Sequence, residues 1–462
     1  MMRLRDLDDC FEGVIPSIIA TSDGDGVPNI SYLSHVVRVD DTHVAISNQF
    51  FAKTAANLHT NPHASLLVVS ARDGRQFRLD AAWVESRDDG PLFERISHQL
   101  KASSVQVGMA GIMRLKTVDI FRVDAVKAVA VPRAQDSQAE AVEGTMRAGT
   151  DRAMQESWGA AAVDYAALGH TMNAIGAQTE AEGVLDAVLD GCEAQGFQHV
   201  IVLLGDTARR LQTTVVSRGY DRPGAGSEVA DGDGLIGMAA AGGRTVKIND
   251  MSRVRRLGAA IETTSPADEN RTRTIALPSL PDALSQIAVP LVAQNVLRGV
   301  LFVESRQRLA FSSAHETALE MLASQCALAL GLCEALAPDA SQAVPSAHLP
   351  ATAGGRTIQV VHHLFDDSVF IDHTYAIKGV AGRLLTFMLS LHIQEGRGEF
   401  TNREIRLADA LKLPDIKDNL ETRLLLLRRR LAEKSFPIQL VHAGRGRVRL
   451  VVDGMPVLSR VR

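Results

Sequence analysis

Two tracts without a periodic apolar pattern interrupt this chain of 462 residues, and they limit what it can fold into. Residues 131–160 are rich in Ala, Gln and Glu, and residues 336–356 are rich in Ala, Pro, Ser and Gly. Segments of this composition act as linkers because they cannot bury enough apolar surface to pack. We therefore predict three separately folded blocks, residues 1–130, 161–335 and 357–462, each long enough to form its own core.

The composition fits a soluble, reduced protein. Hydrophobic residues make up 46% of the chain and charged residues 22%, as in ordinary globular domains. No apolar run approaches the ~20 residues of a membrane span, and the stretch from Met1 to Cys10 is charged where a signal peptide would be apolar. We expect a cytoplasmic location. The four cysteines form no C-x-x-C pair, so reduced thiols are expected at Cys10, Cys192, Cys326 and Cys333.

Charge is distributed unevenly along the chain. From Arg356 to the end there are 18 Lys and Arg against 12 Asp and Glu, a net charge of +6. Residues 1–355 carry 31 against 42, a net charge of −11. A basic C-terminal part on an acidic body is typical of a nucleic-acid-binding domain attached to domains of another function. An ordinary solvent-exposed surface would give the same charge difference.

Short β-branched segments separated by turn signals predict a small β-barrel in the first block. The run Asp23-Gly24-Asp25-Gly26 is a hairpin signal. One helix is expected at Lys53–His59, ended by Asn61-Pro62. Strands are expected at Ile15–Thr21, Val27–Val39, Thr42–Ser47, Ser65–Ser70, Arg75–Ser86 and Val118–Val126.

This order resembles the pyridoxamine 5′-phosphate oxidase-like split barrel, which binds FMN at a dimer interface. The resemblance is most specific from Ser47 through Lys53 and Thr54 to Asn61-Pro62. A phosphate is held by a lysine, a hydroxyl and backbone N–H groups at a helix start, so the resemblance implies that Lys53 and Thr54 hold the FMN phosphate. It also implies a homodimer and a flavin site that includes Ser34, His35, Val36, Ser47, Asn48, Gln49, Arg75 and Gln76. The alternative interpretation of Lys53 is a solvent-exposed lysine at the start of a helix that binds no cofactor.

The sequence is also compatible with cofactors other than FMN in the barrel. The barrel ends near Val131-Pro132 without the Trp and Arg segment of the vitamin-forming oxidases, so oxidation of pyridoxamine phosphate is not expected. Related split barrels bind haem or a deazaflavin, and some are empty. Five histidines keep haem among the alternatives, although a strand histidine is more often structural than an axial ligand: His35, His43, His59, His63 and His98.

The second block alternates helices and strands. It opens with apolar residues at helical spacing from Ala174 to Leu189. A short helix is expected at Met238–Ala241 and a long one at Ser312–Leu332. Strands are expected at His199–Leu204, Leu211–Val216, Thr245–Ile248, Ser285–Pro290 and Val296–Glu304.

That order resembles a GAF domain. The more specific features are Gly234 and Gly237 before the short helix, and the hairpin that leads into Phe311-Ser312. The resemblance implies an α/β sandwich whose pocket either binds a small molecule or is empty. The motif of cyclic-nucleotide binders is absent, and Cys326 is expected to be a small buried hydrophobe, so the GAF ligand stays unknown.

The third block predicts short strands, three helices and a closing hairpin. Thr401 and Glu404 form a capping box for the second helix. The third helix is expected at Ile416–Lys434, before a hairpin of Pro437–Val441 and Arg447–Val452. This order resembles the DNA-binding winged helix of response regulators over residues 358–453.

Helical geometry indicates which residues of that domain would meet DNA. With its leucine stripe inward, the third helix turns Asn419, Thr422, Arg423 and Arg430 outward. Asn419 and Arg423 would read base edges, and phosphates would be contacted by Arg428, Arg429, Arg445 and Arg447. Leu425 and Leu426 also face outward, which indicates that another domain covers part of this surface. A protein-binding winged helix is the alternative.

These blocks predict a multidomain α+β chain, with a split barrel, a GAF sandwich and a winged helix-turn-helix. The leading interpretation is a transcriptional regulator that couples flavin or metabolite sensing to DNA binding. No P-loop, kinase or H-E-x-x-H motif is present. The alternatives are an FMN-dependent oxidoreductase with regulatory domains and a dimeric scaffold with empty pockets.

Overall fold

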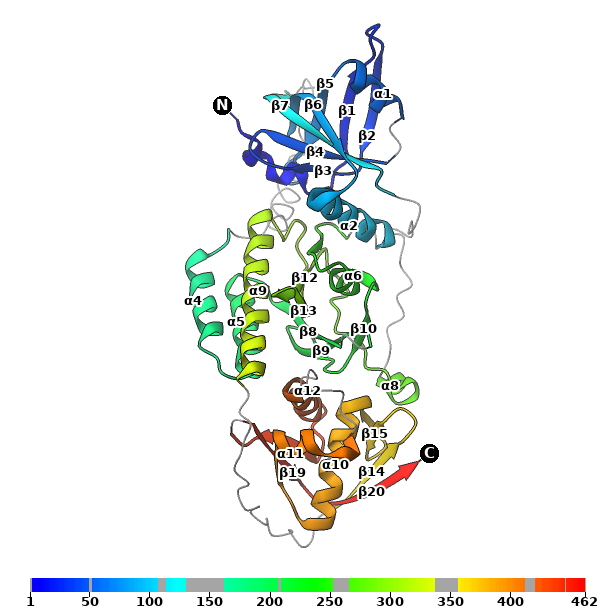
Figure 1. The fold of residues 1–462 in the computed structure, drawn as a ribbon, viewed down its shortest axis with the longest axis vertical. Coiled ribbons are helices and arrows are strands. Elements are labelled where there is room, and N and C mark those ends of the chain that lie inside the picture. The colour runs from blue at the N-terminus through cyan, green and yellow to red at the C-terminus, as the bar shows by residue number, and fades with distance from the viewer. Residues whose placement is uncertain are drawn as a thin grey trace, which may run out of the picture.

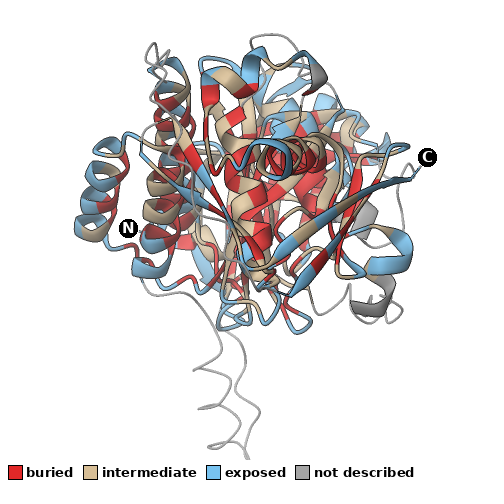
Figure 2. Cartoon of the chain, turned by 90° about the horizontal axis from the view of Figure 1, so that it is seen from below, coloured by how far each residue is buried: buried red, intermediate tan, exposed pale blue. Residues whose placement is uncertain are grey.

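Three folded bodies follow one another along the longest axis of the molecule (Figure 1). The computed structural model describes residues 2–49, 52–106, 114–129, 162–206, 209–251, 266–336, 356–411, 420–444 and 446–461. The two predicted linkers lie almost entirely outside these ranges. Buried residues gather on the inner faces of helices and sheets, and exposed residues cover the outer faces (Figure 2).

The N-terminal body is a seven-stranded antiparallel sheet with the order β2-β1-β5-β6-β7-β4-β3. Alternate residues of β1 and β5 are buried, as expected for strands with one face on a core. The helices are η1 (Leu4–Phe11), α1 (Ala52–Thr60) and α2 (Gly90–Gln106). The strands are β1 (Ser17–Ser22), β2 (Pro28–Leu33), β3 (Val36–Arg38), β4 (His43–Asn48), β5 (His63–Val69), β6 (Gln76–Arg87) and β7 (Thr117–Val129).

Two features of this body differ from the sequence expectation. The single strand predicted at Val27–Val39 is two strands, because the chain bends at Ser34 and His35 and pairs with β4 after the bend. Helix α2 was not predicted. Its Ile96 is almost fully buried and packs with Ala45, Val118 and Ile120, so this side of the helix lies on the barrel.

The middle body is a six-stranded antiparallel sheet, β10-β9-β8-β13-β12-β11, with helices on both faces. Helices α4 (Tyr165–Gly176), α5 (Ala181–Ala194) and α9 (Ser313–Ala335) share one core, and α6 (Gly234–Gly242) packs on the other face. Helix α8 spans Pro266–Thr272. The strands are β8 (His199–Asp206), β9 (Leu211–Arg218), β10 (Glu228–Ala230), β11 (Val246–Ile248), β12 (Ser285–Ala293) and β13 (Val296–Ser305).

The helix expected at the start of this body is two helices. Helix α4 ends at Gly176, a poor helix former, and α5 begins at Ala181 after a turn. Helix α9 is long and apolar enough to span a bilayer, but half of its most apolar stretch is buried. Cys326 on α9 is fully buried, which confirms its structural role. All four cysteines are buried, and none of them forms a disulfide.

The C-terminal body contains two sheets around helices α10 (Gly379–Glu395) and α12 (Leu420–Glu433). One sheet has the order β16-β15-β14-β20, and the other β17-β19-β18. The smaller helices are α11 (Asn402–Leu407) and η2 (Asp409–Leu411). The strands are β14 (Thr357–His363), β15 (Ser368–Ile371), β16 (Thr374–Ile377), β17 (Glu399–Thr401), β18 (Ile438–His442), β19 (Arg447–Val452) and β20 (Met455–Val461). Strand β20, which sequence reasoning missed, pairs in parallel with β14.

Candidate functional site

The bend between β2 and β3 brings part of the predicted flavin site together. The Ser47 backbone N–H donates to the His35 carbonyl at 3.1 Å, so Ser34–Val36 and Ser47–Gln49 are neighbours. Nδ1 of His35 is buried without a hydrogen-bond partner among the described residues. Burial lowers the pKa of His35 to about 4, so the imidazole is neutral near pH 7. Because this nitrogen has almost no accessible surface, a bound group could reach it only after the surrounding chain moved.

The first turn of α1 carries the two predicted phosphate residues. Lys53 is exposed, and no ion pair of Lys53 is found among the described residues. Thr54 is only 2% exposed. Its hydroxyl accepts from Asn29 Nδ2 at 2.9 Å and lies 3.0 Å from Ser31 Oγ. Lys53 is therefore available to an anion, whereas Thr54 positions α1 against β2.

The remaining predicted flavin residues have partners of their own. Asn48 Nδ2 donates to Asp119 Oδ2 at 3.0 Å inside the barrel. Arg75 pairs with Asp73 at 2.6 Å within the β5–β6 turn, and Gln76 begins β6 opposite Val69. Among the described residues, no hydrogen bond or ion pair joins this turn to Lys53 or Ser47. The turn is therefore the weakest part of the predicted site.

A buried carboxyl that sequence reasoning missed lies in the middle body. Glu304 is 2% exposed and accepts from Tyr220 Oη and Gln286 Nε2, each at 2.8 Å, and from the Leu280 N–H at 3.1 Å. Burial raises the pKa of Glu304. These three donors come from separate segments, so the carboxyl ties the 277–284 segment to the sheet.

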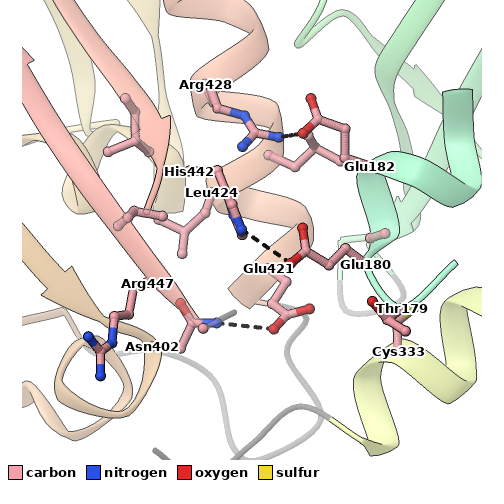
Figure 3. A pocket seen from close by; sticks show the side chains of 15 residues that line it. Thr179, Glu180, Glu182, Cys333, Asn402, Glu421, Leu424, Arg428, His442 and Arg447 are labelled. Atoms are coloured by element: carbon pink, nitrogen blue, oxygen red, sulfur yellow. Dashed lines mark hydrogen bonds and ion pairs between the residues drawn. The ribbon is translucent and has the colours of Figure 1, made fainter. Parts of the chain in front are cut away.

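Helix α12 lies against the middle body through its basic side. Arg428 pairs with Glu182, and Arg429 pairs with Glu182 at 3.1 Å and Asp186 at 2.8 Å. Figure 3 shows the Arg428–Glu182 pair beside a cavity between the two bodies. The same side also carries a pair between Arg423 and Asp206 at 3.3 Å. The predicted DNA-contacting arginines therefore face carboxylates of α5 and β8.

Leu425 confirms that another domain covers this surface, whereas the outward position expected for Leu426 is wrong. Leu425 is 6% exposed and belongs to the core cluster of the middle body. Leu426 is partly buried and packs against the core of its own body. Cover by the middle body explains how α12 carries apolar residues beside its arginines.

The outward position expected for Arg430 is wrong. Its side chain is 1% exposed, Nε donates to the Ala376 carbonyl at 2.9 Å, and Nη2 lies 3.3 Å from Glu269. A guanidinium this deep needs such partners, because an unpaired buried charge is strongly destabilising. Thr422 lies on α12 and Arg447 begins β19, while Asn419 and Arg445 lie outside the described residues.

Comparison with known families supports the first two resemblances. The pyridoxamine 5′-phosphate oxidase family model matches residues 6–131, and the GAF domain model matches residues 178–331. Neither match extends into the C-terminal body, so the winged-helix resemblance stays a prediction. No curated protein matches the chain.

Solved structures similar to parts of the chain include an FMN-binding protein from Syntrophomonas wolfei. It has 19% identity and a TM-score of 0.24, covering 28% of this chain and 88% of that one. The GAF domain of the Acinetobacter phosphoenolpyruvate-protein phosphotransferase has 19% identity and a TM-score of 0.30, covering 38% and 96%. The free methionine-R-sulfoxide reductase from Neisseria meningitidis has 22% identity and a TM-score of 0.30, covering 38% and 95%.

Proposed function

We propose that this chain is a cytoplasmic sensory regulator in which the barrel and the GAF domain control a DNA-binding C-terminal domain. The observation that carries the proposal is the pairing of Arg423, Arg428 and Arg429 with carboxylates of the GAF domain. Carboxylates in these positions take the place that DNA phosphates would occupy. The domain is therefore held in a form that cannot use this helix face on DNA, and a signal would release it.

FMN is the proposed cofactor of the barrel, which works as a homodimer. Lys53, which is exposed at the start of α1, would hold the phosphate. A bound flavin would supply reversible redox chemistry. Arg75 contributes only if it leaves its pair with Asp73.

Because the contact between the two domains depends on ion pairs, small energy changes can shift the balance between the bound and released C-terminal domain. These ion pairs are partly accessible to solvent and contribute up to about 1 kcal/mol each, so three of them hold the domain by up to roughly 3 kcal/mol. A stabilisation of that size lowers DNA affinity by up to about 100-fold. A ligand in the sensor domains would need to change the relative energy of the two arrangements by a similar amount.

The test uses the full chain and two charge-matched variants. Glu182→Gln with Asp186→Asn removes the partners of Arg428 and Arg429, and the affinity for DNA selected from a random pool is expected to rise at least tenfold. The control is Asp190→Asn with Glu193→Gln, because these carboxylates on the same helix pair with Arg218 of the GAF domain itself. If the first variant binds no DNA at low salt, the transcriptional proposal is wrong and the C-terminal domain is a protein-contact module.

A further inference from the structure

A larger cavity than the one in Figure 3, of about 440 Å³, also lies between the GAF domain and the C-terminal domain. This volume is within the range of about 300–1,000 Å³ that is usual for small-molecule sites. The GAF domain contributes the turn before β9 and the segment after α8, which lies beside the C-terminal domain (Figure 1). The C-terminal domain contributes the β14–β15 turn and the start of α10. The charged residues of the lining are Arg209, Arg273, Asp366, Asp367, Lys378 and Arg383.

Positive charge exceeds negative charge around this cavity. Its four cations face two carboxylates of the lining and a third carboxylate, that of Glu228. Glu228 is shared between two cations, because Arg209 Nη1 and Lys378 Nζ each lie 3.0 Å from one of its oxygens. The balance is therefore one positive charge. Protonation of His362 or His363 beside the cavity would only add to it, so its sign does not depend on their state.

The four cations reach accessible space. Their side chains are 49%, 32%, 27% and 26% exposed for Arg209, Arg273, Lys378 and Arg383. All four keep their charge near pH 7, because the ordinary pKa values of lysine and arginine lie far above it. An anion that enters the cavity can therefore meet them without unfolding of either domain.

Arg383 has hydrogen-bond donors that no described residue uses. Its nearest carboxylate oxygen, Asp367 Oδ2, lies 3.6 Å from Nε, which is beyond hydrogen-bond distance. Asp367 Oδ1 lies closer to His362 Nε2, at 3.2 Å. The Arg383 Nε is enclosed, but Nη1 and Nη2 are not. These two terminal nitrogens are therefore the donors that a bound group can use.

The start of α10 favours an anion at the same place. Lys378 is the N-cap residue and makes no side-chain cap, and the first turn of this helix contains no acidic residue. A helix N-terminus carries a partial positive charge, which a capping oxygen or an acidic side chain usually offsets. Here a cation stands in that position, so the helix start adds to the positive potential of the cavity.

We propose that this cavity binds a phosphorylated small molecule. Arg383 and Lys378 at the start of α10 hold its phosphoryl group, together with Arg209 of the GAF domain. Guanidinium groups present N–H donors in a geometry that matches phosphate oxygens, and the helix start favours the same charge. A phosphate ion alone would leave most of the cavity empty, so the volume leaves room for an organic group as well.

The bound molecule would strengthen the contact between the two domains, because the cations that hold it come from both. Under the proposed function, it keeps α12 against the GAF domain and lowers DNA affinity. This consequence rests on the proposed function. Binding itself does not depend on DNA, so the two can be measured separately.

The experiment is calorimetric titration of the full chain at constant ionic strength with three probes. Ribose 5-phosphate carries both a phosphoryl group and an organic group, inorganic phosphate lacks the organic group, and ribose lacks the phosphoryl group. We expect saturable binding of ribose 5-phosphate, weaker binding of inorganic phosphate and no binding of ribose.

Two variants test the assigned residues, one from each domain. Arg383→Gln and Arg209→Gln should each weaken ribose 5-phosphate binding at least tenfold, because each removes a charged contact to phosphate. Arg356→Gln is the control, since it changes the charge equally at an exposed position outside the cavity, where Arg356 pairs with Asp372. An unchanged circular dichroism spectrum shows that each variant is folded.

Four outcomes would overturn the proposal. Absence of saturable ribose 5-phosphate binding would show that the cations do not hold a phosphoryl group, and equal binding of ribose would show that charge is not recognised. Inorganic phosphate that binds as tightly as the ester would show that the site takes the free ion. Equal weakening by Arg356→Gln would show that only the net charge of the chain matters. If binding is as expected but DNA affinity does not change, the site stands and its link to the proposed function fails.

Discussion

Lys247 Nζ lies 2.9 Å from the Glu12 carboxylate, and this buried pair joins the GAF domain to the barrel. Lys247 also pairs with Glu316 at 2.9 Å in the first turn of α9, and Asn249 Nδ2 donates to Glu12 at 2.7 Å. Burial alone would lower the pKa of Lys247, but the two carboxylates outweigh it and raise that pKa. Gly13 follows Glu12 and lies against the His35 ring, so the junction begins next to the candidate flavin site.

Lys247→Met should strongly destabilise the junction. It leaves the Glu12 carboxylate, whose side chain is 8% exposed, without its cation, which costs about 3 kcal/mol. The melting temperature, measured by calorimetry, should fall by roughly 6–12 °C. Lys127→Met is the control, because the Lys127–Asp80 pair is exposed and contributes little. A raised lysine pKa keeps the stabilisation fully present below the ordinary lysine pKa, so the difference should be the same at pH 7 and pH 9.

Lys53→Ala should remove most bound flavin without unfolding the barrel. A charged contact to phosphate contributes about 1.5–3 kcal/mol, so FMN affinity should fall at least tenfold in a fluorescence titration. Thr54→Ala should act differently, by lowering stability, because it removes the partner of Asn29 and Ser31. Flavin binding that is identical in wild type and Lys53→Ala would contradict the phosphate assignment.

His35 should make the barrel less stable in mild acid. Its pKa in the folded protein is lowered to about 4, below the ordinary value near 6.5, so the unfolded chain binds a proton first as pH falls. Stability is therefore lost between about pH 6.5 and pH 4. His35→Asn should show a smaller drop in melting temperature between pH 7 and pH 4.5 than wild type. Equal drops would mean that other groups set the acid sensitivity.

Leu425→Asp should separate the C-terminal domain from the GAF domain. The new carboxylate would replace a leucine that is 6% exposed within the GAF core cluster. Burying an unpaired charge there is unfavourable, so the domains should part rather than accept it. Small-angle scattering should show a larger radius of gyration. Leu332→Asp, at an exposed position of α9, should leave the radius unchanged.

Local patterns in the sequence predicted the elements better than the contacts between domains. Asn61-Pro62 ends α1 because proline and its preceding residue disfavour helix, and the sequence shows this directly. Helix α2 buries Ile96 against the sheet, but its weak apolar periodicity does not predict a helix. The Arg428–Glu182 pair joins residues 246 positions apart, and no local pattern encodes it. The sequence indicated this contact only through the predicted outward position of Leu425, which the structure buries against the middle body.

The arginines predicted to contact phosphates lead to the last prediction. In the Glu182→Gln, Asp186→Asn variant, DNA affinity should fall steeply with salt, because Arg428, Arg429, Arg445 and Arg447 displace counterions, with a log–log slope of about −0.9 per phosphate. Replacing Arg445 and Arg447 together by Ala should flatten that slope by about two and weaken all sequences alike. Arg423→Ala should instead relax preference at one base position, since a side chain that reads a base edge discriminates among sequences. Binding measured from 50 to 200 mM salt separates the two effects, and an unchanged slope would show that the hairpin does not touch phosphates.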